Sequence, residues 1–193
     1  NAAGSSLVYA TFLGGSSRDC GYDIAVQGNA AYVTGETGAS DLPTTPGAFD
    51  TSYNGGGEYG EDAFVVKLNA AGSALVYGTF LGGTSVERGY GIAVDSEGNA
   101  YITGSTHSGE DTFPLKVGPG LVHGRYFPDA FVAKINPAGD ALVFATFLGG
   151  NSADYGRAID EYEKVLEVQP SRPDTLVRLG DCYLQRGAVS AAL

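Results

Sequence analysis

The sequence has few of the residues that carry chemistry or cross-link a fold. It contains no tryptophan, no methionine, two cysteines and two histidines in 193 residues. Cys20 and Cys182 cannot form a disulfide framework and do not have metal-site spacing, so we expect both to be unpaired. A nucleophile triad needs a histidine, and His107 and His123 both fall in one variable loop, where we expect them to be exposed.

Basic side chains are also scarce. Eleven Lys and Arg against 22 Asp and Glu give a formal net charge of −11. Because nucleic acids and anionic membranes bind basic patches, this charge argues against both as partners. No apolar run approaches the roughly 18 residues of a membrane helix, and residues 1–20 lack the basic start and apolar core of a signal peptide. Residues 1–6 match residues 69–74, in the middle of a repeat, so we expect residue 1 to be an internal cut or a processed end.

The chain does contain a nine-residue stretch that occurs three times. The copies start at Leu7, Leu75 and Leu142 and end at Gly-Gly pairs. Their β-branched and aromatic content and their short length predict a strand.

Both faces of this predicted strand are apolar. In the second copy, Leu75 and Tyr77 point to one face, while Val76 and Phe80 point to the other. An antiparallel sheet with one wet face would alternate apolar and polar residues instead. The pattern therefore predicts a sheet that is covered on both sides.

Three more strands are predicted in each repeat. In the second repeat they are residues 89–94, 100–104 and 129–135, and the first repeat has a hairpin over residues 22–35 followed by a strand over 62–68. Long loops, 36–61 and 105–128, precede the third strand. The expected fold is mainly β, with antiparallel four-stranded sheets, two complete and part of a third.

The repeated runs resemble a known family. Residues 89–104, residues 129–139 and the nine-residue strand are similar to the bacterial seven-bladed β-propeller repeat, called SBBP, over residues 1–156. The resemblance implies propeller-type blades and a place in an exported or cell-surface bacterial protein. It implies no shared catalytic residues.

The pattern changes to a helical one in the third copy. Ile159, Tyr162 and Leu166 share one face of a predicted helix, and a second helix follows the prolines after it. Residues 157–193 resemble a tetratricopeptide repeat, with 34 residues between Ala158 and Ala192. We therefore expect a C-terminal α-helical hairpin as a second unit, after the β repeats of residues 1–156.

No constellation predicts catalysis or a bound cofactor. Asp95, Glu97 and Asn99 have the spacing of calcium ligands, but a tight turn prefers the same residue types, and we interpret them as a turn. Glu58, Glu61 and Asp62, beside three glycines, form a weak candidate for a cation site, with Ca²⁺ as the ion.

The leading functional hypothesis is a non-enzymatic structural protein outside a bacterial cell. Since two blades do not close a propeller, neighbouring copies would complete the sheets in a homo-oligomeric ring or filament. The candidate assembly residues come from the first strand copy and the predicted helices: Leu7, Tyr9, Phe12, Leu176, Leu179 and Tyr183.

Three alternatives stay open. The first is a glycan- or calcium-binding module that uses loops 36–61 and 105–128, with Tyr53, Tyr59 and Tyr126 as a sugar-binding surface. The second is a fragment of a longer propeller, in which the missing sheets belong to the same chain. The third, a propeller enzyme, is disfavoured because no convergent acid–base set is present.

Overall fold

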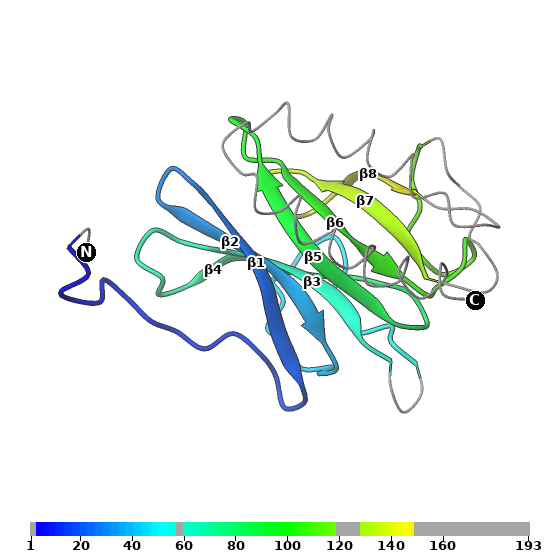
Figure 1. The fold of residues 1–193 in the computed structure, drawn as a ribbon, viewed down its shortest axis with the longest axis horizontal. Coiled ribbons are helices and arrows are strands. Elements are labelled where there is room, and N and C mark those ends of the chain that lie inside the picture. The colour runs from blue at the N-terminus through cyan, green and yellow to red at the C-terminus, as the bar shows by residue number, and fades with distance from the viewer. Residues whose placement is uncertain (1–2, 57–59, 119–127, 149–193) are drawn as a thin grey trace, which may run out of the picture.

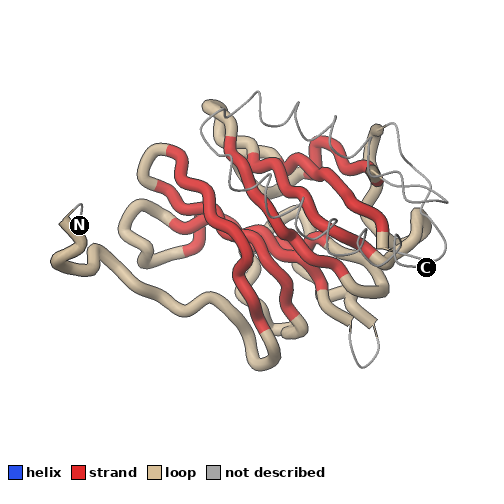
Figure 2. Tube along the Cα trace, viewed as in Figure 1, coloured by secondary structure: helices blue, strands red, loops and turns tan. Residues whose placement is uncertain are grey.

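In a computed structural model of the chain, the structure describes residues 3–56, 60–118 and 128–148. These residues form eight strands and no helix (Figure 2). The strands are β1 (Asp19–Gln27), β2 (Ala30–Thr37), β3 (Asp62–Leu68), β4 (Leu75–Leu81), β5 (Glu87–Val94), β6 (Ala100–Thr106), β7 (Asp129–Ile135) and β8 (Leu142–Phe147).

The strands make two antiparallel sheets in which each strand pairs with the next along the chain. The first sheet has the order β1-β2-β3-β4 and the second the order β5-β6-β7-β8. Figure 1 shows the two sheets side by side, with β5 of the second sheet next to the first sheet. β5 packs across β1, β2 and β3, so the inner edge strand of the second sheet lies on a face of the first.

The hairpins form because their turns place glycine where the backbone needs a positive φ. Gly28 between β1 and β2 has φ 61°, and Gly98 between β5 and β6 has φ 89°. The β3–β4 and β7–β8 turns use Gly72 and Gly139 in the same way, with φ 63° and 75°. These turns all lie at one end of the sheets, so the long loops meet at the other end.

Two hydrophobic clusters lie on the two faces of the first sheet. The larger cluster fills the space between the sheets and joins Tyr32 and Tyr77 of the first to Ile92, Ile102 and others of the second. The smaller cluster lies on the opposite face, which we call the outer face; it comprises Ala31, Leu42, Phe64, Val66, Leu68 and Phe80, with Leu13, Val33, Tyr53 and Leu75 packed at its margin. The expectation that this sheet is apolar on both faces is confirmed. The predicted face of Leu75 is wrong, because the register shifts between Lys67 and Leu68 and Leu75 packs with Phe80 and not with Tyr77.

The long loops cover the last strand of each sheet. The amide of Thr45 donates to the carbonyl of Gly78 at 3.1 Å, and the amide of Phe80 donates to the carbonyl of Asp50 at 3.0 Å. In the second sheet, Lys116 and Ala145 exchange two backbone hydrogen bonds of 3.0 and 2.8 Å. Each loop therefore satisfies the free edge of β4 or β8, which would otherwise be open to other strands.

The predicted fold class, which combined β sheets with a C-terminal helical hairpin, needs correction. The described residues support a mainly β protein of two four-stranded sheets, and a C-terminal helical hairpin is not shown. The third copy of the repeated strand is β8, the last strand of the second sheet. The predicted part of a third blade lies outside the described residues. Residues 157–193, with Leu176, Leu179 and Tyr183, lie outside the described residues. In the described part there is no helix long and apolar enough to cross a membrane.

A second correction concerns the first copy of the repeated strand. Residues 7–13 are not a strand, and they pair with no strand among the described residues. The physical reason is that β4 and β8 each lie beside a hairpin partner, β3 or β7, whereas no described strand lies beside residues 7–13. In Figures 1 and 2 the segment runs along the side of the first sheet that is remote from the second.

Candidate functional site

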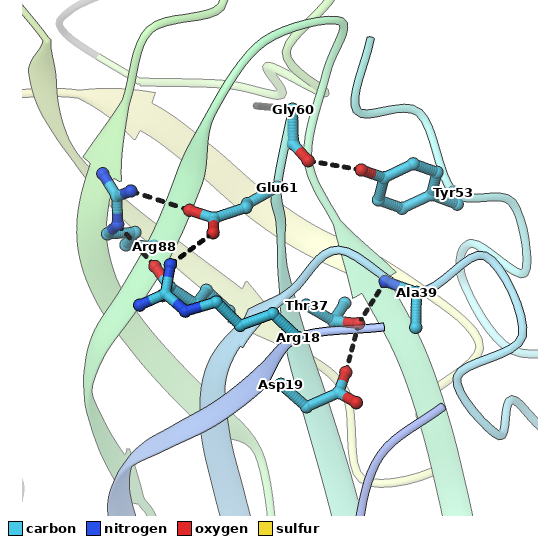
Figure 3. Close-up of polar contacts among 9 residues, drawn as sticks. Arg18, Asp19, Thr37, Ala39, Tyr53, Gly60, Glu61 and Arg88 are labelled. Atoms are coloured by element: carbon cyan, nitrogen blue, oxygen red, sulfur yellow. Dashed lines mark hydrogen bonds and ion pairs between the residues drawn. The ribbon is translucent and has the colours of Figure 1, made fainter. Parts of the chain in front are cut away.

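Charged side chains gather at the loop end of the junction between the two sheets (Figure 3). Arg88 on β5 reaches Glu36 on β2 and Glu61 just before β3, and Arg18 reaches the same two carboxylates. The Arg18–Glu36, Arg18–Glu61 and Arg88–Glu61 pairs measure 2.8, 2.6 and 2.7 Å. The four side chains thus alternate in sign around a closed ring.

The ring joins the sheets because its members come from both. Backbone contacts reinforce it, since the amide of Glu87 donates to the carbonyl of Glu61 at 2.6 Å. The side chain of Glu36 is fully buried, whereas those of Arg88 and Arg18 are 28% and 60% exposed. Burial would lower the pKa of Arg88, but attraction to Glu36 and a hydrogen bond with it raise that pKa above its ordinary value. Neither arginine is therefore suited to act as a base.

Two buried carboxyl groups lie beside this ring. Oδ2 of Asp62 accepts a hydrogen bond from the Asn54 amide at 2.8 Å, but Oδ1 has no hydrogen-bond partner within the described residues. Glu87 accepts from the Gly83 amide at 2.7 Å and from the Thr106 hydroxyl at 2.6 Å. Burial raises the pKa of Asp62 to about 7, the Asn54 amide opposes the rise, and the charge of Glu87 adds to it.

The glycine pairs after the repeated strands are held by the same type of contact. Gly15 donates to Asp19 at 2.8 Å, as Gly83 does to Glu87, and the hydroxyl of Thr37 donates to Asp19 at 2.5 Å. Figure 3 shows Thr37 between Asp19 and the amide of Ala39. These acidic residues therefore stabilise turns, and these contacts by themselves do not point to a bound ligand.

The candidate cation residues do not converge on an open site. Glu58 lies outside the described residues, Glu61 is held by two arginines, and Asp62 is buried. Within residues 3–56, 60–118 and 128–148, no group of three or more His, Cys, Asp and Glu could hold a metal ion.

The other candidate residues also have structural contacts. Asp95 accepts hydrogen bonds from the amides of Glu97 and Asn99 at 3.0 and 2.9 Å, as expected for a turn. The Tyr53 hydroxyl donates to the Gly60 carbonyl and its ring packs on Phe80 at 6.0 Å, so no observation favours the sugar-binding alternative. The remaining candidates for these roles, His123, Tyr59 and Tyr126, lie outside the described residues.

His107 and Cys20 lie within the described part of the chain. His107 is exposed, with Nδ1 3.3 Å from the Val86 carbonyl, and Cys20 is a free, half-buried thiol. Neither contacts a second group that would make a nucleophile and base pair.

The feature that sequence reasoning missed is on the outer face of the first sheet. Ile24 and Val26 on β1 are 49% and 59% exposed, although their repeat equivalents on β5, Ile92 and Val94, are 1% and 0% exposed. Ile24 lies opposite Val33, and Val26 opposite Ala31, so both extend the apolar cluster of this face. The sequence carries no signal for this difference, because the two Ile-Ala-Val runs are identical and only the packing of the sheets distinguishes them.

The assembly candidates of residues 7–13 are also apolar and exposed. Leu7 and Phe12 are 83% and 104% exposed, and Tyr9 is 37% exposed. A Cβ added to Gly72 would overlap the ring of Tyr9, so this tyrosine rests on the β3–β4 turn. Residues 7–13 therefore expose apolar side chains on the side of the first sheet that is remote from the second (Figure 1).

Comparison with known proteins supports part of the family resemblance. A family model described as a β-propeller repeat, SBBP, matches residues 76–110, which run from β4 through β5 and β6. No curated protein matches the chain. The propeller repeat is shown for these residues, and nothing here supports the tetratricopeptide resemblance of residues 157–193.

Proposed function

We propose that the protein is a non-enzymatic protein-interaction module that binds a partner β-sheet by stacking it on the outer face of the first sheet. The observation that carries the proposal is the difference between Ile24 and Val26, about half exposed, and Ile92 and Val94, fully buried by the neighbouring sheet. In the second sheet this face is covered by the first sheet. In the first sheet the equivalent face is exposed at the same two repeat positions.

The size of the expected effect follows from the exposed area. Complete burial of an Ile or Val side chain contributes about 1.5–3 kcal/mol. Because roughly half of each side chain is already covered, the two residues together would contribute about 2 kcal/mol, or about 30-fold in affinity.

The net charge and the family resemblance support the type of partner and the location that we propose. The net charge of −11 favours a protein partner over nucleic acid. Similarity to exported bacterial repeat proteins supports an extracellular or cell-surface location. The open face of the first sheet differs from the surfaces of the second sheet, so association between copies would be head-to-tail, as in a ring or filament.

The test measures the association of a labelled copy of the intact chain with unlabelled chain by fluorescence anisotropy. We expect the wild-type chains to associate, and we expect the double variant I24E/V26E to associate at least tenfold more weakly. Val143, 42% exposed on β8, supplies a matched control, and V143E should bind within twofold of wild type. Equal binding by I24E/V26E and V143E would remove the basis of the proposal.

A further inference from the structure

Asp62 and Glu87 bring two carboxyl groups together where the first and second sheets meet. Asp62 begins β3 and Glu87 begins β5, and both residues are fully buried. A Cβ added to Gly82 would lie 2.5 Å from Oδ1 of Asp62 and 2.9 Å from Oε2 of Glu87, so both oxygens face the same glycine. The pair therefore spans the junction with one carboxyl group from each sheet.

The hydrogen bonds of the pair leave one oxygen without a donor. Glu87 accepts from the amide of Gly83 at 2.7 Å and from the hydroxyl of Thr106 at 2.6 Å. Oδ2 of Asp62 accepts from the amide of Asn54 at 2.8 Å, whereas Oδ1 has no hydrogen-bond partner in the described part of the chain. Because a buried carboxylate oxygen without a partner is costly, Oδ1 needs either a proton or a cation.

No basic side chain compensates the charge of this pair. The two arginines of the ring bind Glu36 and Glu61, and no ion pair among the described residues includes Asp62 or Glu87. Burial raises the pKa of Asp62, and the charges of Glu87 and of the half-buried Asp50 add to the rise. Since ionised carboxylates repel each other strongly in a buried site, this site favours a bound positive charge.

The turn at the end of β4 does not need the second carboxyl group. In the first repeat, Asp19 accepts from the Gly15 amide at 2.8 Å, as Glu87 does from its own glycine. The three atoms nearest to a Cβ added at Gly14 all belong to Asp19, so a single acid holds that turn. The buried position of Asp62 beside Glu87 therefore calls for a different explanation.

The chemistry of the two donors selects the type of cation. Carboxylate oxygens are hard ligands, which suit Ca²⁺ and Mg²⁺ better than the softer transition metals. Mg²⁺ demands near-ideal octahedral geometry and usually keeps several waters, whereas Ca²⁺ accepts irregular sets of about six to eight oxygens that include backbone carbonyls. Because a fully buried pair has little room for a hydrated ion, Ca²⁺ is the better match.

We propose that Asp62 and Glu87 bind a calcium ion that links β3 of the first sheet to β5 of the second. Backbone carbonyl oxygens and water would complete the coordination, because two carboxylates supply only part of it. A site with two charged ligands should be weak, with a Kd of about 10⁻⁴–10⁻³ M, as in extracellular calcium modules. The ion would act within one chain, so this inference goes beyond the proposed binding of a partner sheet.

Titration of the intact chain with CaCl₂, after treatment with EDTA, tests the site. In isothermal titration calorimetry we expect a single ion to bind, and we expect Asp62→Asn and Glu87→Gln each to weaken binding at least tenfold. Because Glu87 also holds a turn, circular dichroism melting in EDTA checks the fold of each variant, and Asp62→Asn decides the outcome if Glu87→Gln does not fold. Unchanged binding by Asp62→Asn would overturn the inference.

Glu97→Gln is the matched control. Glu97 is an exposed acid in the turn that has the spacing of calcium ligands, and its loss changes the net charge by the same amount as Asp62→Asn. We expect Glu97→Gln to bind calcium within twofold of wild type. A tenfold loss in this variant would place the ion in that turn and would contradict the site at Asp62.

Proton release gives a second readout that a site elsewhere on the surface would not show. Since the pKa of Asp62 is about 7, calcium must displace its proton at lower pH. We expect release of about one proton per ion at pH 6 and little release at pH 8.5, measured from the dependence of the binding enthalpy on the buffer. Calcium binding at pH 6 without proton release would exclude Asp62 as a ligand.

Thermal unfolding gives a third readout. A ligand that binds only the folded chain stabilises it, so 10 mM CaCl₂ should raise Tm by about 3 °C or more in wild type and have no such effect in Asp62→Asn. An equal rise with MgCl₂ at the same concentration would contradict a calcium site. The I24E/V26E variant should bind calcium as wild type does, so failure of this inference and failure of the proposed function are separate results.

Discussion

Asp62 is a buried acid that faces a second acid across the junction of the sheets. A Cβ on Gly82 would lie 2.5 Å from Oδ1 of Asp62 and 2.9 Å from Oε2 of Glu87, so the two carboxyl groups flank the same glycine. Glu87 accepts hydrogen bonds from the Gly83 amide and the Thr106 hydroxyl, whereas Oδ1 of Asp62 has no hydrogen-bond partner among the described residues. Burial therefore favours the neutral form of Asp62.

This arrangement makes the free energy of unfolding depend on pH. The pKa of Asp62 is raised to about 7 by burial, with Glu87 and Asp50 adding to the rise, while an aspartate in an unfolded chain titrates near 3.9, about 3 units lower. Between about pH 4 and pH 7 the folded protein binds more protons than the unfolded chain, so stability falls as the pH rises through this window. Above about pH 7 the contribution is constant.

We predict that Asp62→Asn removes this loss of stability at rising pH. The amide is neutral at every pH and has the shape of the acid, so the variant should match wild type near pH 4 and exceed it by about 1–3 kcal/mol at pH 8. Urea unfolding at the two pH values measures the difference. Asp111→Asn, at an exposed position, changes the net charge equally and should show no such gain; a gain of the same size there would assign the effect to net charge.

At the scale of the element, β1 and β5 share a bulge that sets the position of their side chains. The register shifts between Gly21 and Asp23 in β1 and between Gly89 and Gly91 in β5. Opposite each bulge the neighbouring strand has a glycine, Gly35 or Gly104. The bulge brings the carbonyl of Cys20 or Arg88 so close to this glycine that a side chain would overlap it.

We predict that Gly104→Ala destabilises the second sheet. The new Cβ would collide with the Arg88 carbonyl, a backbone atom that moves only if the ladder moves, and the cost of such overpacking is about 1–3 kcal/mol or more. Urea unfolding followed by circular dichroism measures it. Gly109→Ala has open space around the new Cβ, and its free energy of unfolding should stay within about 0.5 kcal/mol of wild type; equal losses at both positions would contradict the proposed collision.

The elements show how far the sequence could predict this fold. The third strand was predicted at residues 62–68 and 129–135, and β3 and β7 have these bounds, because period-two patterns and glycine turns are local signals. Residues 7–13 have the same composition as β4 and were predicted to be a strand. They are not one, because a strand also needs a partner ladder, which local composition does not report.

At the scale of the whole molecule, the junction between sheets combines an apolar cluster with one ionic ring. The ring could not be predicted from the repeat, because Arg18 and Glu36 stand where the second repeat has Val86 and Ser105. Only the three-dimensional packing of β2, β5 and the loop before β3 brings the four charges together. The apolar character of residues 7–13 can be read from the sequence, whereas the exposure of Leu7 and Phe12 is known only from the structure.

The two arginines of the ring offer a matched pair for testing what holds the sheets together. Arg88→Met leaves the fully buried Glu36 with one exposed partner, so we expect a loss of about 2–4 kcal/mol in the free energy of unfolding. Arg18→Met makes the same change in net charge but removes a side chain that is 60% exposed, so a much smaller loss is expected. Urea unfolding at low salt and in 1 M NaCl separates the two effects, because screening should reduce the smaller loss and leave most of the larger one. Equal losses for the two variants would show that burial of Glu36 does not decide the strength of the junction.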